Sequence, residues 1–210
     1  MKIGTDGVLL GAWASLHHTP NSILDIGTGT GIVALQLAQR SYANPIDALE
    51  LDTNAYIQAV ENFENSQWSD RLFCYHASLQ EFTDENDDKY DLIVSNPPFF
   101  KDNYETNDEA RNRARFTSSL SFEELITSIS KLLSHDGIFS VVIPFKEEGN
   151  FMKLAKAKNL YPARICHVKG SPNSEIKRSL LEFTFNQKEV NREQLTIETT
   201  RHNYTLDYIN

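Results

Sequence analysis

An asparagine followed by two prolines ends one of the apolar segments of the sequence. The segment reads DLIVSNPPFF and places Asn96, Pro97, Pro98 and Phe99 in succession. Adjacent prolines fit neither a continuing strand nor a helix interior, so packing does not explain the asparagine. The Asn96 side-chain carbonyl and the Pro97 backbone carbonyl can each accept an N–H of a planar amine, and Phe99 can stack on its ring. We therefore predict that residues 96–99 carry the chemistry.

A glycine-rich loop is the second candidate site. The sequence LDIGTGTGI places Asp25 before Gly27, Gly29 and Gly31. Glycines permit positive φ and close approach of a ligand, and the start of the following helix offers free N–H groups. The G-x-G-x-G spacing differs from that of dinucleotide sites, and Asp25 would repel a pyrophosphate, so a cationic or amino-acid-bearing ligand is favoured. Glu50, in the later segment LELD, is placed to accept ribose hydroxyls. A glycine turn without a ligand is the alternative.

Alternating elements position these residues. Strand-like and amphipathic runs alternate from about residue 22 to 168, which predicts an α/β fold with a parallel sheet covered on both faces. The expected strands are 22–26, 46–51, 71–76, 91–95 and 137–144, and the expected helices are 31–40, 53–65 and 121–133. Three later strand-like runs, 165–170, 179–186 and 194–199, predict an antiparallel pair that completes the sheet. The candidate residues all follow strands, and ligands bind at the carboxyl ends of strands in such folds.

Composition and charge restrict which partners and sites the protein can have. The 210 residues are 40% hydrophobic and carry a net charge of −9. Residues 1–100 hold 4 Lys and Arg against 14 Asp and Glu, whereas residues 151–188 hold 8 against 2, which permits a basic face on an acidic protein. No apolar run approaches the roughly 20 residues of a membrane helix, and the two cysteines lack metal or disulfide spacing. We expect a cytoplasmic protein that uses neither a membrane nor a metal.

The glycine loop and the acid after the next strand resemble those of the class I S-adenosylmethionine-dependent methyltransferases. The resemblance implies a Rossmann-like fold with a mostly parallel seven-stranded sheet, an antiparallel C-terminal strand pair and helices on both faces. It also implies that Gly27 and Gly29 line the methionine half of the cofactor and that Glu50 holds the ribose, with Asp25, Gly31 and Leu51 also in the cofactor site. Many relatives place an aspartate near the adenine amine where this chain has Ser78, so Ser78 and the backbone of Leu79 are expected to replace it.

The Asn-Pro-Pro-aromatic motif resembles that of amino-methyltransferases, which act on adenine N6, cytosine N4 or the amide of glutamine. Such nitrogens are weak nucleophiles because their lone pair is delocalised. Acceptors at Asn96 and Pro97 would localise that pair, so catalysis rests on positioning, with neither a metal nor a strong base. Phe99, with Phe100 beside it, would stack on a flipped base.

The opening sequence MKIGTDGVLLGAW closely resembles that of the bacterial adenine-N6 methyltransferases of valine tRNA, which modify the adenine beside the anticodon. The likeness continues through ENFENSQWSDRL, ARFTSSLSFEELI and KRSLLEF and spans nearly the whole chain. It implies a tRNA substrate, no obligatory protein partner, and positions for Thr5 and Asp6 near the methionine end of the cofactor. It further implies one methyltransferase domain over residues 1–210, trimmed at both ends relative to the family.

The contacts with the substrate are predicted from charge. The segment 100–118 resembles a lid, and within it Arg115 is expected to reach RNA, although the acids of the same segment offer it partners within the protein. Lys177 and Arg178, in the basic region, are expected to contact the RNA backbone. Two other functions use the same residues. One is methylation of a protein glutamine, and the other is a catalytically silent scaffold that binds the cofactor.

Overall fold

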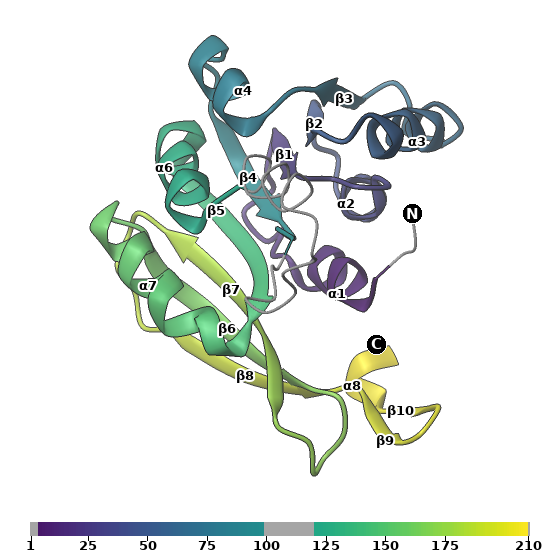
Figure 1. The fold of residues 1–210 in the computed structure, drawn as a ribbon, viewed down its shortest axis with the longest axis vertical. Helices are drawn as coiled ribbons and strands as arrows, with labels where there is room; N and C mark the ends of the chain where they lie inside the picture. Colours follow the sequence, from purple (N-terminus) through teal and green to yellow (C-terminus); the bar gives the residue numbers. More distant parts are fainter. Residues whose placement is uncertain (1–3, 99–119, 210) are drawn as a thin grey trace, which may run out of the picture.

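The core of the protein is a single large sheet with helices on both faces (Figure 1). The computed structural model describes residues 4–98 and 120–209. Within these residues the sheet has eight strands in the order β3-β2-β1-β4-β5-β7-β6-β8. The strands are β1 (Ile23–Ile26), β2 (Ile46–Glu50), β3 (Leu72–His76), β4 (Tyr90–Ser95), β5 (Leu133–Pro144), β6 (Tyr161–Lys169), β7 (Ile176–Thr184) and β8 (Asn191–Thr196).

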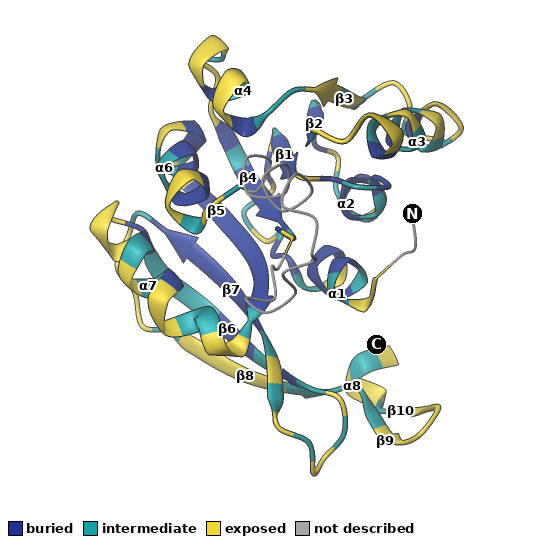
Figure 2. Ribbon diagram, in the orientation of Figure 1, coloured by how far each residue is buried: buried dark blue, intermediate teal, exposed yellow. Residues whose placement is uncertain are grey.

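The helices divide between the two faces and build two cores. One face carries α1 (Thr5–Trp13), α2 (Ile32–Arg40) and α3 (Thr53–Glu64), and the other carries α4 (Leu79–Glu85), α6 (Phe122–Leu132) and α7 (Glu148–Ala157). Alternate residues of the central strands point to each side, as strand geometry requires. In β4, for example, Leu92 and Val94 join the first core and Ile93 joins the second. The central strands are therefore buried on both faces (Figure 2).

The register of the strands brings three loops to one edge of the sheet. Ile26 is level with Leu49 on one side and with Ser95 on the other. The next residues along the chain are Gly27, Glu50 and Asn96, so the three predicted motifs begin at the same height. This edge is formed by the carboxyl ends of parallel strands, where α/β folds bind their ligands.

The C-terminal third departs from the parallel arrangement as predicted. Strand β7 runs antiparallel to both neighbours, β5 and β6, which confirms the antiparallel pair. Strand β8, which overlaps the predicted run 194–199, pairs parallel to β6 and makes the sheet eight-stranded, one strand more than the resemblance implied. A small hairpin of β9 (Glu198–Thr200) and β10 (Asn203–Tyr204) and the short helix α8 (Leu206–Ile209) follow. No helix in the described part of the chain has the length and apolar character needed to span a membrane.

Candidate active site

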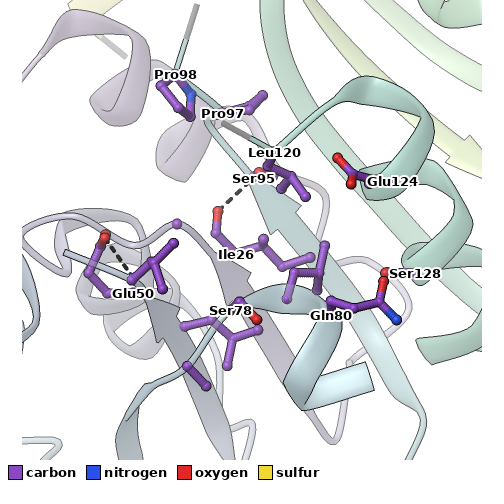
Figure 3. Close-up of a pocket in the computed structure, with 15 residues that line it drawn as sticks. Ile26, Glu50, Ser78, Gln80, Ser95, Pro97, Pro98, Leu120, Glu124 and Ser128 are labelled. Atoms are coloured by element: carbon purple, nitrogen blue, oxygen red, sulfur yellow. Dashed lines mark hydrogen bonds between the residues drawn. The ribbon is translucent and has the colours of Figure 1, made fainter. Parts of the chain in front are cut away.

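A cavity of about 360 Å³ opens at the carboxyl edge of the sheet. Gly27 and Glu50 border it, and so do Pro97 and Pro98 after β4. Figure 3 shows Glu50 on one side and Gln80, Glu124 and Ser128 on the other, with Ser78 between them. The cavity thus joins the glycine loop, the acid after β2 and the proline motif, three features that lie far apart in the sequence.

The glycine loop has the backbone conformation that its composition predicts. Gly27, Gly29 and Gly31 have φ values of 70°, 60° and 81°, a region that side chains strongly disfavour. A Cβ at Gly31 would lie 2.4 Å from Cε1 of Phe63, so this glycine is required for packing against α3. A Cβ at Gly27 would meet no atom within 4 Å. Gly27 therefore faces open space at the cavity, where a ligand can approach the backbone.

The Glu50 carboxylate fastens the glycine loop to the end of β2. Its Oε2 accepts the N–H of Gly29 at 2.8 Å, and its Oε1 accepts the N–H groups of Leu51 and Asp52, both at 2.9 Å. A carboxylate offers about four acceptor sites, so a ligand hydroxyl can still be accommodated. Leu51 is 50% exposed beside it and gives the cavity an apolar surface. Glu50 thus supports the loop and remains placed for a ribose.

Asp25 lies inside the loop and does not border the cavity. Its side chain is buried and its Oδ2 accepts a hydrogen bond from the Thr28 hydroxyl at 2.6 Å. Burial raises the pKa of this carboxyl to about 7, because charge is poorly solvated there. The predicted contact between Asp25 and a cationic ligand stays a prediction, and the structure adds that this acid supports the turn.

Asn96 faces helix α1. A Cβ on Gly7 would lie 3.7 Å from Nδ2 of Asn96, an ordinary contact distance, so the first turn of α1 packs next to the amide. Pro97 is buried, whereas Pro98 is exposed. Helix α1 therefore forms one wall of the reaction side, next to the residue predicted to orient the substrate amine.

The first turn of α1 is tied to the sheet by an ion pair. Nε of Arg178, in β7, donates to Oδ2 of Asp6 at 2.7 Å, and both side chains are partly buried. Sequence reasoning assigned Asp6 to the cofactor and Arg178 to RNA, and the structure brings the two together. Thr5, at the start of the helix, is exposed.

The far end of α1 is anchored by a network that sequence reasoning missed. The guanidinium of Arg164, in β6, lies 3.8 Å above the Trp13 ring and donates to the Trp13 carbonyl. It also lies 3.4 Å from Glu182, whose side chain is only 4% exposed and accepts the Ser15 N–H at 2.7 Å. Burial raises the pKa of Glu182, and the positive charge of Arg164 opposes that change. No local sequence motif predicts this network, because its members are about 150 residues apart in the chain.

The remaining predicted residues are distributed as follows. Ser78 and Leu79 border the cavity at the start of α4. Lys177 is exposed near the start of β7. Phe99, Phe100, Arg115 and the lid segment 100–118 lie outside the described residues. Among those that are described, no three His, Cys, Asp or Glu residues are grouped to hold a metal ion.

The fold and the arranged motifs define a class I methyltransferase. The chain matches the Methyltransferase small domain family over residues 7–154. A predicted O-methyltransferase from Agrobacterium tumefaciens has a similar structure, with a TM-score of 0.71 at 16% identity over 97% of this chain and 93% of the other. A TehB-like SAM-dependent methyltransferase from Corynebacterium glutamicum gives a TM-score of 0.57 at 19% identity over 87% and 88% of the two chains. At these identities the likeness concerns the fold.

The particular family is shown by closer relatives. A tRNA1(Val) (adenine(37)-N6)-methyltransferase from Flavobacterium psychrophilum is 60% identical, over 100% of this chain and 89% of the relative. Enzymes of the same name from Bacteroides fragilis and Trichodesmium erythraeum are 46% and 44% identical, each over 100% of this chain and 88% of the relative. The chain belongs to the tRNA1(Val) (adenine(37)-N6)-methyltransferase family, as its motifs predicted.

Proposed function

We propose that this protein transfers a methyl group from S-adenosylmethionine to N6 of an adenine in tRNA, the adenine at position 37 of tRNA1(Val). The observation that carries the proposal is the position of Asn96 and Pro97. They follow β4 at the edge where the glycine loop and Glu50 border the cavity. The relatives named for this reaction support the choice of substrate.

The cavity suits the cofactor. Gly27 leaves open space above its backbone, Glu50 retains acceptor capacity, and Leu51 offers an apolar surface. We propose that Gly27, Gly29 and Gly31 pass closest to the methionine part, while Glu50 accepts the ribose hydroxyls and Leu51 packs against the base. Asp25 and Ser78 complete the set that sequence reasoning assigned to this ligand. Asp6 supports the wall of the site through Arg178.

When bound, S-adenosylmethionine supplies an electrophilic methyl group, and its transfer to nitrogen leaves S-adenosylhomocysteine. The residues of the chain orient the nucleophile. The side-chain carbonyl of Asn96 and the backbone carbonyl of Pro97 accept the two N–H protons of the adenine amine, which localises the nitrogen lone pair. Both prolines lack an N–H group and stiffen the loop. Because the proton leaves after the nitrogen becomes cationic, no strong base is needed, and positioning accounts for most of the rate.

The RNA is proposed to approach over the reaction side, with Phe99 and Phe100 stacking on the flipped base and Arg115 and Lys177 contacting phosphates. Arg178 already holds Asp6, so its contribution to RNA binding would be indirect. We further propose that residues 1–210 form one methyltransferase domain that acts in the cytoplasm, where its tRNA substrate is found.

The test is nucleoside mass spectrometry of unmodified tRNA1(Val) incubated with the protein and S-adenosylmethionine. New N6-methyladenosine is expected, located at position 37 by digestion into oligonucleotides. Asn96→Ala should lower the rate by about 10³-fold or more, since the positioning contribution is lost, and leave the affinity for S-adenosylhomocysteine nearly unchanged. Methylation of a glutamine peptide, with tRNA left unmodified, would overturn the proposal.

A further inference from the structure

The end of the cavity away from Glu50 is polar, and the residue expected to recognise adenine there is already engaged. The Ser78 hydroxyl donates to Oε2 of Glu81 at 2.7 Å and accepts the Glu81 N–H at 3.2 Å. These bonds form a capping box at the start of α4. The only hydroxyl proton of Ser78 and one of its lone pairs are therefore used by the helix.

Gln80 presents an oriented amide at this end of the cavity. Its Nε2 donates to both carboxylate oxygens of Asp84, at 3.0 and 2.9 Å, one turn further along α4. A carboxylate can only accept, so these bonds define which end of the amide is nitrogen. Oε1 of Gln80 is thus the atom left to meet a ligand, and Gln80 borders the cavity (Figure 3).

Ser128 provides a complementary hydroxyl. It lies in α6, only 3% exposed, and borders the same cavity as Gln80. Among the described residues no partner is found for its hydroxyl. The neighbouring Glu124 is held in place because its Oε2 accepts from the N–H and the hydroxyl of Ser121, at 2.9 and 2.6 Å. The Ser128 hydroxyl is not among the fully buried side-chain atoms that lack a partner, so it is accessible at the cavity and can donate to a ligand.

We propose that Gln80 and Ser128 recognise the 6-amino edge of the cofactor's adenine, an inference that rests on the proposed function. The exocyclic amine of adenine donates, and the adjacent ring N1 accepts. Oε1 of Gln80 accepts an N–H of the amine, and the Ser128 hydroxyl donates to N1. Asp84 is the positioning residue, because it fixes the orientation of the amide. A 6-oxo base has the opposite pattern, so its carbonyl would face Oε1 without a proton between them.

The test measures binding, independently of methyl transfer. Calorimetry gives the Kd of S-adenosylhomocysteine and of its 6-oxo analogue, S-inosylhomocysteine, for the wild type and each variant. We expect the wild type to prefer the 6-amino ligand by about 5- to 100-fold, the range for one unsatisfied polar pair. Gln80→Leu should reduce that preference to about twofold or less and Ser128→Ala should reduce it partly. Asp84→Ala should also reduce it, because the amide is then free to rotate.

A control variant separates the role of Gln80 from general effects of losing a glutamine side chain. Gln39→Leu, on the exposed end of α2, should keep the wild-type preference, and melting temperatures verify that every variant is folded. If Gln80→Leu retains the full preference, or if Ser78→Ala alone removes it, the assignment to Gln80 is wrong while the proposed function stands. If the wild type binds neither ligand, the proposed cofactor itself is wrong, and the inference fails with it.

Discussion

The two sides of the site are held together in different ways. On the cofactor side most fixing contacts are local, and the longest of them, from the Gly29 N–H to Glu50, spans 21 residues. Asp25 bonds Thr28, Glu50 bonds the two residues that follow it, and Ser78 bonds Glu81. On the reaction side, Asp6 and Arg178 are 172 residues apart, and Trp13 and Glu193 are 180 apart. The cofactor side is thus specified by short segments, whereas the wall beside Asn96 depends on contacts with the C-terminal strands.

This difference has a consequence for stability and catalysis. Changes on the cofactor side should act through the loop that they belong to, and their effects should appear in ligand affinity or in folding of that loop. Changes on the reaction side should act at a distance, by moving α1 relative to Asn96. Substitutions in each region therefore test whether ligand affinity and catalytic rate can be changed independently.

The largest effect is expected within the glycine loop. Gly31→Ala places a methyl group 2.4 Å from Phe63 in a left-handed conformation, so we expect a loss of about 2–5 kcal/mol in the free energy of unfolding. Gly27→Ala has the same backbone conflict but no clash, and should cost about 1–2 kcal/mol. Urea denaturation measures both, and calorimetry should show weaker S-adenosylhomocysteine binding for Gly27→Ala. Equal stability losses for the two variants would contradict the assigned packing role of Gly31.

The next effect concerns the anchor at the far end of α1. Arg164→Met keeps the aliphatic stem but leaves Glu182 buried without its counter-ion, so we expect a loss of about 3 kcal/mol in the free energy of unfolding. The loss should be smaller at acidic pH, where Glu182 is protonated. Arg192→Met, on the exposed part of β8, is the matched control and should change stability little. An unchanged urea midpoint for Arg164→Met would show that α1 is held by apolar packing alone.

The same contrast explains what could be predicted from the sequence. The periodic runs gave β1, β2 and β4 nearly to the residue, so Gly27, Glu50 and Asn96 could be placed at one edge. Helix α1 was not assigned, because Gly7 and Gly11 lower helix propensity and its apolar residues form no stripe. In the structure Gly11 allows close approach of α2, since a Cβ on Gly11 would lie 2.2 Å from Oε1 of Gln36.

Two other features differ in how far the sequence predicts them, namely the start of α4 and the ion pair between Asp6 and Arg178. The sequence SLQE at residues 78–81 matches a capping box, which marks the start of α4. The family resemblance instead predicts Ser78 as a contact for adenine. The pairing of Asp6 with Arg178 has no local signature, because it depends on where β7 enters the sheet.

A smaller effect, on catalysis, is expected from the ion pair at the first turn of α1. Arg178→Met or Asp6→Asn should lower kcat about tenfold, because the turn that covers Asn96 loses its tether while the far end of α1 stays anchored. The Kd of S-adenosylhomocysteine should change less than about threefold, since the cofactor side is fixed locally, and a partly exposed pair adds only about 1 kcal/mol to stability. Steady-state kinetics and calorimetry separate the two parameters.

A variant that exchanges the charges of Asp6 and Arg178 tests whether the ion pair itself supports kcat. Asp6→Arg combined with Arg178→Asp restores opposite charges and should recover part of kcat relative to either single change. Asp87→Asn, an exposed acid before β4, is the control. A larger loss in cofactor affinity than in kcat would mean that Asp6 belongs to the cofactor side, as its sequence motif implied.

The last effect is a dependence of stability on pH, and it follows from the buried acid of the glycine loop. The pKa of Asp25 is raised from 3.8 to about 7, so between these pH values the folded protein holds a proton that the unfolded chain has released. The resulting stabilisation is complete below pH 4 and is lost as the pH rises through about 7. Asp25→Asn keeps an acceptor for Thr28 and cannot ionise. The melting temperature of Asp25→Asn should rise relative to that of the wild type between pH 4 and 7 and stay level above pH 7. Each kcal/mol of difference in the free energy of unfolding should shift the melting temperature by about 2–4 °C.

Differential scanning calorimetry at pH 5, 6, 7 and 8 measures this trend, with the exposed Asp70→Asn as the matched control. A gap that stays constant with pH would mean that Asp25 is ionised throughout and is stabilised by the loop. Adding S-adenosylhomocysteine extends the test to the ligand. If the ligand's ammonium group lies near Asp25, binding at pH 7 should release a proton, because a positive neighbour lowers the pKa of a carboxyl. The heat of binding would then vary with the ionisation enthalpy of the buffer for the wild type and not for Asp25→Asn, which would give this acid a part in binding besides its part in the turn.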